Sequence, residues 1–197
     1  MQFLKTKLAG VIEIIPRIFE DDRGYFYETY NIEKFRENGI PVDFLQDNQS
    51  FSTKGVVRGL HFQRAPFGQG KLVRVIQGAV LDVVVDIRPD SPTYGQYDSF
   101  LLTAENKKMV YLPEGFAHGF STLEDAIFSY KCTNVYDKAS EGGILYNDPD
   151  LNIDWQVSDP VVSDKDLELP SWKSFNPYFF NTLPRFSIAC YKDVYSR

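Results

Sequence analysis

The chain has 197 residues, of which 43% are hydrophobic and 24% charged, a composition typical of one soluble globular domain. Its net charge of −6 argues against general binding of nucleic acid, which requires a basic surface. No stretch approaches the roughly 18 apolar residues of a membrane span or forms a signal-peptide core, and Cys132 and Cys190 are too few for a disulfide framework, so we expect a cytoplasmic protein.

Short strands dominate the predicted secondary structure. Glycine and proline recur between segments that are rich in valine, isoleucine, phenylalanine and tyrosine, which is the pattern of an all-β protein. Helices are few. The first is predicted to begin after Asn31, which serves as its N-cap, and to end at Gly39.

A β-hairpin is predicted next, with strands at residues 71–76 and 79–88 joined at Gln77-Gly78. Strict alternation gives the second strand one apolar face and one mixed face. The apolar face holds Leu81, Val83, Val85 and Ile87, and the mixed face holds Val80, Asp82, Val84, Asp86 and Arg88. We expect this strand in the wall of a sandwich or barrel, with its mixed face toward either solvent or a polar cavity.

A further strand is predicted at residues 126–136. Alternation places Phe128, Tyr130, Cys132, Asn134 and Tyr136 on one of its sides. A second helix is predicted to start at Ser163, because Ser163 and Asp166 have the spacing of a capping box. No internal repeat, low-complexity tract or linker divides the chain, so we predict one all-β domain with a few short peripheral helices.

Both histidines lie in short aromatic motifs. His61 belongs to the segment RGLHFQ at residues 58–63, and His118 belongs to GFAHGF at residues 115–120. Histidine is the side chain whose ordinary pKa, about 6.5, lies nearest neutrality, so each is a candidate for moving protons. The alternative is that each is an ordinary histidine with a satisfied hydrogen bond.

Together with other segments, these motifs resemble the dTDP-4-dehydrorhamnose 3,5-epimerase family, whose members are cupin-type jelly rolls. The matching segments follow the family's order and are residues 19–28, 46–50, 58–63, 69–74, 83–95, 105–107, 113–120, 130–131, 147–150, 153–155 and 163–166. The resemblance implies one cupin-type domain over residues 1–180. Residues 181–197 form a C-terminal extension to which no role is assigned.

The resemblance implies an enzyme that inverts C3 and C5 of dTDP-4-dehydro-6-deoxy-D-glucose. The product, dTDP-4-dehydro-L-rhamnose, would lead to dTDP-L-rhamnose and cell-surface polysaccharide. Both carbons lie beside the C4 ketone, so loss of either proton gives an enolate. Such a site needs a base, a group that stabilises the enolate oxygen, and an acid on the opposite face of the sugar.

Four residues match the family's catalytic positions. His61 matches the base, Asp166 the carboxylate that orients it, Lys71 the cation beside the C4 oxygen, and Tyr130 the acid of the opposite face. Each also has a structural interpretation. Asp166 has the position of a helix-capping acid, Lys71 suits an exposed surface, and Tyr130 suits the core of a strand.

Eight further residues are candidates for substrate binding. Arg23 and Arg58 match phosphate-binding arginines, and Glu28, Gln46 and Asn48 match positions near the nucleoside. Tyr136 suits either the nucleotide or the core, His118 matches a residue lining the sugar, and Asp82 is expected beside it. Arg58 and His61 are three residues apart, so a regular strand would place them on opposite faces. Either a bulge intervenes or they serve different parts of the site, in one subunit or in two.

No metal and no organic cofactor are expected. The chain lacks the His-x-His pair of metal-binding cupins, and deprotonation beside a ketone requires neither. The resemblance implies a homodimer that exchanges N-terminal strands and residues. The alternatives are an enzyme that epimerises one carbon or shifts the ketone of a related dTDP-sugar, and a non-catalytic cupin that binds sugar nucleotides. The second would have lost His61, Lys71 or Asp166, and all three are present.

Overall fold

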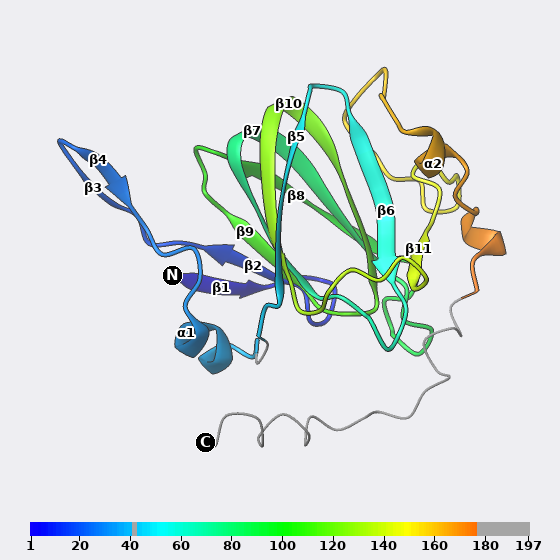
Figure 1. The fold of residues 1–197 in the computed structure, drawn as a ribbon, viewed down its shortest axis with the longest axis horizontal. Helices are drawn as coiled ribbons and strands as arrows, with labels where there is room; N and C mark the ends of the chain where they lie inside the picture. Colours follow the sequence, from blue (N-terminus) through cyan, green and yellow to red (C-terminus); the bar gives the residue numbers. More distant parts are fainter. Residues whose placement is uncertain (41–42, 177–197) are drawn as a thin grey trace.

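Antiparallel strands account for most of the regular secondary structure in the computed structural model, which describes residues 1–40 and 43–176 (Figure 1). The strands are β1 (Gln2–Lys5), β2 (Ile12–Ile15), β3 (Phe19–Asp21), β4 (Gly24–Phe26), β5 (Gln46–Ser52), β6 (Val57–Gln63), β7 (Lys71–Asp86), β8 (Tyr97–Thr103), β9 (Met109–Leu112), β10 (Phe116–Cys132) and β11 (Glu141–Gly143). The predicted boundary at residue 180 and the extension 181–197 lie outside the described residues.

Two long strands, β7 and β10, run side by side and each belongs to two walls. The first half of β7 pairs with β9 and its second half with β8. Likewise, the first half of β10 pairs with β6 and its second half with β5. The β9 wall is defined as β1, β2, β9 and β5 together with the first half of β7 and the second half of β10. The β8 wall is defined as β8, β6 and β11 together with the second half of β7 and the first half of β10. The two walls face each other as a sandwich.

The predicted hairpin at Gln77-Gly78 is wrong, because β7 continues through it as one strand. Both halves of β7 pair with β10, whose register shifts between Thr122 and Phe128 as the two strands bend together. Gly78 allows this bend. Its φ is +74°, and a Cβ atom there would lie 2.1 Å from the carbonyl oxygen of Asp125. Gly78 therefore lies where two paired strands approach each other closely, and not in a turn.

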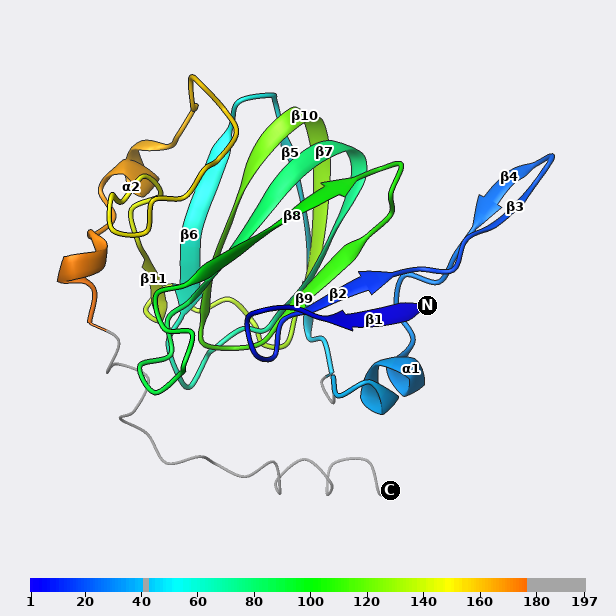
Figure 2. The same cartoon turned by 180° about the vertical axis from the view of Figure 1, so that it is seen from behind.

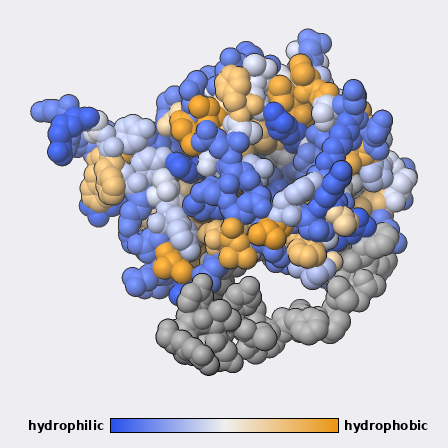
Figure 3. Space-filling model, in the orientation of Figure 1, coloured by the Kyte–Doolittle hydropathy of each residue, from blue (hydrophilic) through white to orange (hydrophobic). Residues whose placement is uncertain are grey.

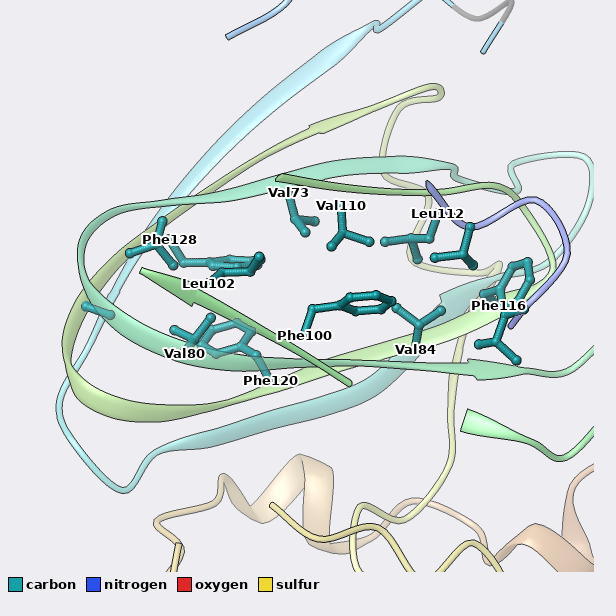
Figure 4. Close-up of a cluster of buried hydrophobic side chains, with 14 residues drawn as sticks. Val73, Val80, Val84, Phe100, Leu102, Val110, Leu112, Phe116, Phe120 and Phe128 are labelled. Carbon is teal, nitrogen blue, oxygen red and sulfur yellow. The ribbon is translucent and has the colours of Figure 1, made fainter. Parts of the chain in front are cut away.

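The main core fills the space between the walls (Figure 4). Val73, Val110 and Leu112 extend from the β9 wall toward Val80, Val84, Phe116 and Phe120 of the β8 wall, with Phe100 and Leu102 between them. Burying each such side chain stabilises the fold by about 1.5–3 kcal/mol relative to leaving it exposed. The mixed face of β7 thus points inward, where Asp82 and Asp86 are fully buried.

Part of the outer face of each wall is also covered. The apolar face of β7 (Leu81, Val83, Val85 and Ile87) packs against Ile144, Tyr146, Leu151 and Trp155 from the segment after β11. On the β9 wall, Leu72, Met109 and Tyr111 pack against Phe35 and Ile40 from helix α1 (Ile32–Glu37) and the residues after it. Alternation therefore predicted the two faces of β7 correctly, and the structure shows that both are buried.

Within the described residues, the helices are short and peripheral, as predicted (Figure 2). Asn31 caps α1 by accepting hydrogen bonds from the backbone N–H groups of Glu33 and Lys34, and Gly39 follows the helix with a φ of +83°. The others are α2 (Asp164–Leu167) and one 3₁₀ turn, Trp172–Ser174. The all-β fold class is thus confirmed. Among the described residues, no helix has the length and apolarity to span a membrane.

The strand predicted at residues 126–136 both begins and ends earlier in the structure than expected. It is the second half of β10, which begins at Phe116 and ends at Cys132. Phe128 and Tyr130 lie on one side as predicted and contact the main core. Tyr136 lies beyond the strand, in the loop that leads to β11.

Strands β3 and β4 form a separate hairpin that projects from the sandwich (Figures 1 and 2). All six of its strand residues are exposed, with Phe19, Tyr25 and Phe26 at 50%, 61% and 66%. Figure 3 shows hydrophobic surface on this projection beside a hydrophilic tip. An isolated two-stranded hairpin is only marginally stable in water, so such exposed rings are suited to contact with another surface.

Candidate active site

A cleft opens where β5, β6, β7 and β10 meet. It consists of two adjoining cavities of about 310 Å³ and 370 Å³, both lined by His61, Lys71 and Tyr130. We call them the Asp166 half and the Tyr136 half. The Asp166 half is also lined by Ser50, Arg58, His118, Gly119, Phe120, Phe128, Ser163, Lys165 and Asp166. The Tyr136 half is also lined by Gln46, Asn48, Phe62, Gln63, Gln69, Tyr136 and Glu141.

The strand pairing explains why these side chains meet. His61 on β6 lies directly opposite His118 on β10, and Asn48 on β5 lies opposite Tyr130 on β10. Lys71 begins β7, opposite Cys132. His61 thus belongs to the β8 wall, whereas Lys71 and Tyr130 belong to the β9 wall, and the cleft lies between them.

Arg58 and His61 line the same half of the cleft because β6 carries a bulge. His61 pairs with His118 and Arg58 with Phe120, so three steps along β6 match two along β10. The first of the two explanations offered by the sequence, a bulge, is therefore correct. The Arg58 guanidinium donates to Ser52 Oγ at 3.0 Å and to the carbonyl of Phe51, which holds it over β5.

Gly59 makes this bulge possible. Its φ is +124°, and a Cβ atom would lie 2.6 Å from the Cα atom of Gly119 and 2.9 Å from the carbonyl oxygen of His118. We expect Gly59→Ala to lower the free energy of unfolding by about 2–4 kcal/mol, from backbone strain and overpacking together. Gly39→Ala is the matched control, because its φ is also positive but nothing lies within 4 Å of the added carbon. Urea unfolding measures both, and equal losses would contradict the argument from close approach.

His61 is paired with Asp166. Its Nε2 lies 2.8 Å from one carboxylate oxygen, and the other oxygen accepts from the backbone N–H of Gly59 at 3.2 Å. Burial raises the pKa of Asp166, but the hydrogen bonds from His61 and Gly59 outweigh burial, and the net pKa is lowered. The carboxylate is therefore ionised at neutral pH and, as an acceptor only, takes the Nε2 proton of His61. In the neutral form of the imidazole, the Nδ1 atom of His61 then carries the lone pair.

The capping-box interpretation of Asp166 is wrong for its carboxylate. Ser163 does cap α2, by accepting from the backbone N–H of Asp166. The Asp166 side chain, however, extends away from the helix start to His61 and Gly59. The short helix thus places the carboxylate at the cleft.

A second histidine–carboxylate pair lies beside the first. His118 Nε2 lies 2.7 Å from one oxygen of Asp82, and both residues are buried. Burial lowers the pKa of His118, against the opposing effect of Asp82. Asp82 is fully buried on β7 and does not line the cleft itself. It lies behind His118, on the inward side of the strand.

Lys71 is an unpaired cation in this cleft. Among the residues that the structure describes, no carboxylate forms an ion pair with it, and its ammonium lies 5.9 Å from the centre of the Tyr130 ring. Burial lowers the pKa of Lys71, and this outweighs the opposing effects of nearby Cys132 and Asp82. Burial also raises the pKa of the Tyr130 phenol. The exposed-surface interpretation of Lys71 and the pure core interpretation of Tyr130 do not hold, because both line the cleft.

Two predicted site residues lie outside the cleft of this chain. Arg23 is at the tip of the projecting β3–β4 hairpin, its side chain is 90% exposed, and it pairs with Asp21. Glu28 follows the hairpin and pairs with Lys34 and Asn31. Neither residue lines either half of the cleft.

The cleft also contains polar residues that the sequence reasoning did not assign. Lys165 and Glu141 form an ion pair of 2.7 Å, with Lys165 lining the Asp166 half and Glu141 the Tyr136 half. Ser50 has a buried hydroxyl without a hydrogen-bond partner in the described chain. Lys165 is next to Asp166 in the sequence, and Ser50 lies two residues after Asn48 on the same strand, so these candidates could have directed attention to both. Nothing in the sequence singled out Glu141. No group of three His, Cys, Asp or Glu side chains within residues 1–40 and 43–176 is arranged to hold a metal.

Comparison with known proteins identifies the family of this chain. The profile of the dTDP-4-dehydrorhamnose 3,5-epimerase family matches residues 5–174. A dTDP-4-dehydrorhamnose 3,5-epimerase of Shigella flexneri is 51% identical over 169 residues, which are 85% of this chain and 93% of that protein.

Solved structures show the same likeness. An epimerase of the same description from Elizabethkingia anophelis is 48% identical with a TM-score of 0.85, over 89% of this chain and 98% of that one. The dTDP-6-deoxy-D-glucose-3,5-epimerase of Legionella pneumophila, solved with dTDP-4-keto-L-rhamnose, is 43% identical with a TM-score of 0.86, over 94% and 98%. The cupin-type jelly roll is confirmed, and the chain belongs to the dTDP-4-dehydrorhamnose 3,5-epimerase family.

Proposed function

We propose that this protein epimerises C3 and C5 of dTDP-4-dehydro-6-deoxy-D-glucose to give dTDP-4-dehydro-L-rhamnose, in the synthesis of dTDP-L-rhamnose. The observation that carries the proposal is the convergence of a base, a cation and an acid on one cleft. His61 is paired with an ionised Asp166, Lys71 is free of carboxylate partners in the described chain, and Tyr130 lies beside Lys71.

In this mechanism His61 removes the proton beside the C4 ketone. Its Nδ1 lone pair accepts the proton, and Asp166 stabilises the resulting imidazolium through Nε2. The electrons of the C–H bond move into the C4 carbonyl, and Lys71 stabilises the enolate oxygen. Tyr130 then delivers a proton to the opposite face. His61 and Tyr130 stand on different walls of the sandwich, which suits attack from two sides.

The nucleotide occupies the rest of the cleft in this proposal. The Arg58 guanidinium and the unpartnered Ser50 hydroxyl supply donors for the diphosphate. Gln46, Asn48 and Tyr136 line the Tyr136 half, where amide groups and an aromatic ring suit the nucleoside. His118, supported by Asp82, lines the sugar. None of these steps requires a metal or an organic cofactor.

A homodimer completes the site in this proposal. Arg23 and Glu28 match the family's substrate-binding positions, yet the hairpin that carries Arg23 projects from its own sandwich with exposed aromatic rings. Reciprocal insertion of the hairpin into a second copy would bury these rings and bring Arg23 to the partner's diphosphate. A two-fold symmetric dimer would contain two such sites. The protein is proposed to work in the cytoplasm.

Mixing two inactive variants tests this arrangement. Arg23→Ala and His61→Ala are each expected to be inactive or nearly so. If each site takes Arg23 from one subunit and His61 from the other, a mixed dimer has one intact site. If equal amounts of the two variants are unfolded and refolded together, about half of the dimers are mixed. Because each mixed dimer has one intact site of two, about a quarter of the wild-type activity should return. No recovery in dimers shown by native mass spectrometry to be mixed would contradict the exchange.

The pH dependence of kcat/KM tests the role of Lys71. Because burial lowers the pKa of Lys71, its charge is present below that pKa and is lost as pH rises through it. Since kcat/KM reports the free enzyme, it should fall on the alkaline side at a lower pH than the ordinary lysine value of about 10.4. The raised pKa of Tyr130 keeps the phenol protonated in this range.

Two variants test this assignment. Lys71→Arg should move the alkaline fall of kcat/KM to higher pH. Tyr130→Phe should lower kcat/KM without changing the pH at which it falls. An alkaline fall unchanged in Lys71→Arg would contradict the assignment.

The proposed function itself is tested by proton NMR of the substrate in heavy water. Enzyme-dependent entry of deuterium at both C3 and C5 is expected. Exchange at one carbon alone would indicate the mono-epimerase alternative. Binding of dTDP without any exchange would indicate a non-catalytic sugar-nucleotide-binding protein.

A further inference from the structure

The RGLHFQ motif contains a residue that the mechanism does not use. Gln63 ends β6 two residues after His61, so both side chains lie on the same side of the strand. Its exposure is only 6%, and it lines the Tyr136 half of the cleft together with His61. A buried amide at this place needs hydrogen-bond partners, and their identity shows what the side chain holds.

The side-chain amide of Gln63 forms hydrogen bonds with the two peptide groups that flank Tyr136. Its Nε2 donates to the carbonyl oxygen of Val135 at 3.1 Å, and its Oε1 accepts from the backbone N–H of Asp137 at 2.7 Å. The second N–H of the same amide donates to the carbonyl oxygen of Phe67 at 2.6 Å. Both amide hydrogens and the oxygen are therefore used, and a single side chain ties together the loops before β7 and after β10.

Tyr136 depends on such side-chain support because it lies outside the sheet. β10 ends at Cys132, and Tyr136 has no strand partner. Its own backbone N–H donates to Gln46 Oε1 at 2.8 Å, and its hydroxyl donates to Glu141 Oε2 at 3.0 Å. Tyr136 as a whole residue nevertheless remains 52% exposed, and it lines the cleft. Side-chain hydrogen bonds therefore hold an accessible aromatic ring in one place without a ligand.

We propose that Gln63 is a positioning residue that fixes Tyr136 for its contact with the nucleoside of the substrate. The inference rests on the proposed function, because it takes Tyr136 to be a nucleoside contact. A ring already held in place loses less conformational entropy when the ligand binds, which increases affinity without new contacts. Gln63 thus acts on binding of the nucleoside, whereas His61 on the same side of the strand acts on the sugar.

The test compares ligands that do and do not contain the nucleoside. Titration calorimetry with dTDP should show that Gln63→Leu weakens binding about tenfold, the range of one ordered side chain. Binding of inorganic pyrophosphate, which lacks the nucleoside, should remain unchanged. In turnover, KM should rise about tenfold while kcat stays within about threefold. If Gln63→Leu folds poorly, Gln63→Glu serves as a near-isosteric variant that replaces the Nε2 donor to Val135 and Phe67 with an oxygen.

A double-mutant cycle separates positioning from general damage. Gln63→Leu should have little further effect on dTDP binding in a Tyr136→Ala background, because the group that it positions is gone. The matched control is Asn106→Leu. Its amide also makes three backbone hydrogen bonds, with Thr103, Lys108 and Leu101, in a loop that lines neither half of the cleft. Its dTDP affinity should equal that of the wild type.

Three results would overturn the inference in distinguishable ways. An equal loss of dTDP affinity from Gln63→Leu with and without Tyr136 would show that Gln63 does not act through that ring. A loss of pyrophosphate binding to the same extent, or a fall in kcat at unchanged KM, would show general damage to the site. If Tyr136→Ala itself leaves dTDP binding unchanged, the nucleoside role of Tyr136 in the proposed function fails as well.

Discussion

Replacing His61 with alanine is expected to slow deuterium exchange at both C3 and C5 by about 10²–10⁴-fold, the usual contribution of one positioned acid–base group. Both carbons should be affected, because the proposed mechanism uses the same base for each. Binding of dTDP should persist, since the proposed mechanism has His61 act on the sugar and not on the nucleotide. Exchange followed by proton NMR, with calorimetry of dTDP, measures the two effects separately.

Asp166→Asn is the companion variant for this prediction. An asparagine side chain retains an oxygen that can accept from the Gly59 N–H, so the bulge of β6 should survive. It removes the negative charge that stabilises the His61 imidazolium. We therefore expect a loss in the same direction, with the melting temperature close to that of the wild type. An Asp166→Asn protein with full exchange activity would be incompatible with the assigned pair.

Replacing Lys71 with methionine is expected to lower kcat by about 10²–10³-fold, equivalent to about 3–4 kcal/mol of transition-state stabilisation. The lysine charge acts in a cleft that excludes much of the water, so it stabilises an enolate oxygen more strongly than a solvated cation would. Methionine has a similar shape and leaves no unpaired partner, because no carboxylate of the described chain forms an ion pair with Lys71. The fold should therefore be retained.

Lys54→Met is the control for this variant. Lys54 is an exposed lysine in the turn between β5 and β6, and it lines neither half of the cleft. Its replacement removes the same charge from the protein, and kcat should stay within about twofold of the wild type because exposed charges interact weakly. A Lys71→Met protein that matched Lys54→Met in kcat would exclude Lys71 as the enolate-stabilising group.

Local sequence patterns determined several features of this protein. Alternation in residues 79–88 predicted which side chains share a face, and the Asn31 and Gly39 signals predicted the limits of helix α1. These predictions succeed because strand alternation and helix capping depend on neighbouring residues alone. The segments around His61 and His118 likewise carried the resemblance to the epimerase family, and the comparisons confirm the family.

Only the tertiary structure decided how those segments meet. Gly78 reads as a turn residue, yet pairing of both halves of β7 with β10 makes it a bend. Asp166 has the spacing of a capping acid, yet its carboxylate reaches His61, a partner 105 residues away. A strand that is apolar on one face gives no indication of what will cover the other, and β7 proved to be buried on both.

The same limit applies to the cleft. Ten of the twelve candidate residues line it or, like Asp82, support a residue that does, whereas Arg23 and Glu28 lie elsewhere on this chain. Residue types and motif order suggested the chemistry, because a base, a cation and an acid can be recognised singly. Their distances, the bulge that turns Arg58 toward His61, and the burial that shifts the pKa of Lys71 come from pairing between distant strands. Such non-local contacts leave no periodic signal in the sequence, so they required the folded structure.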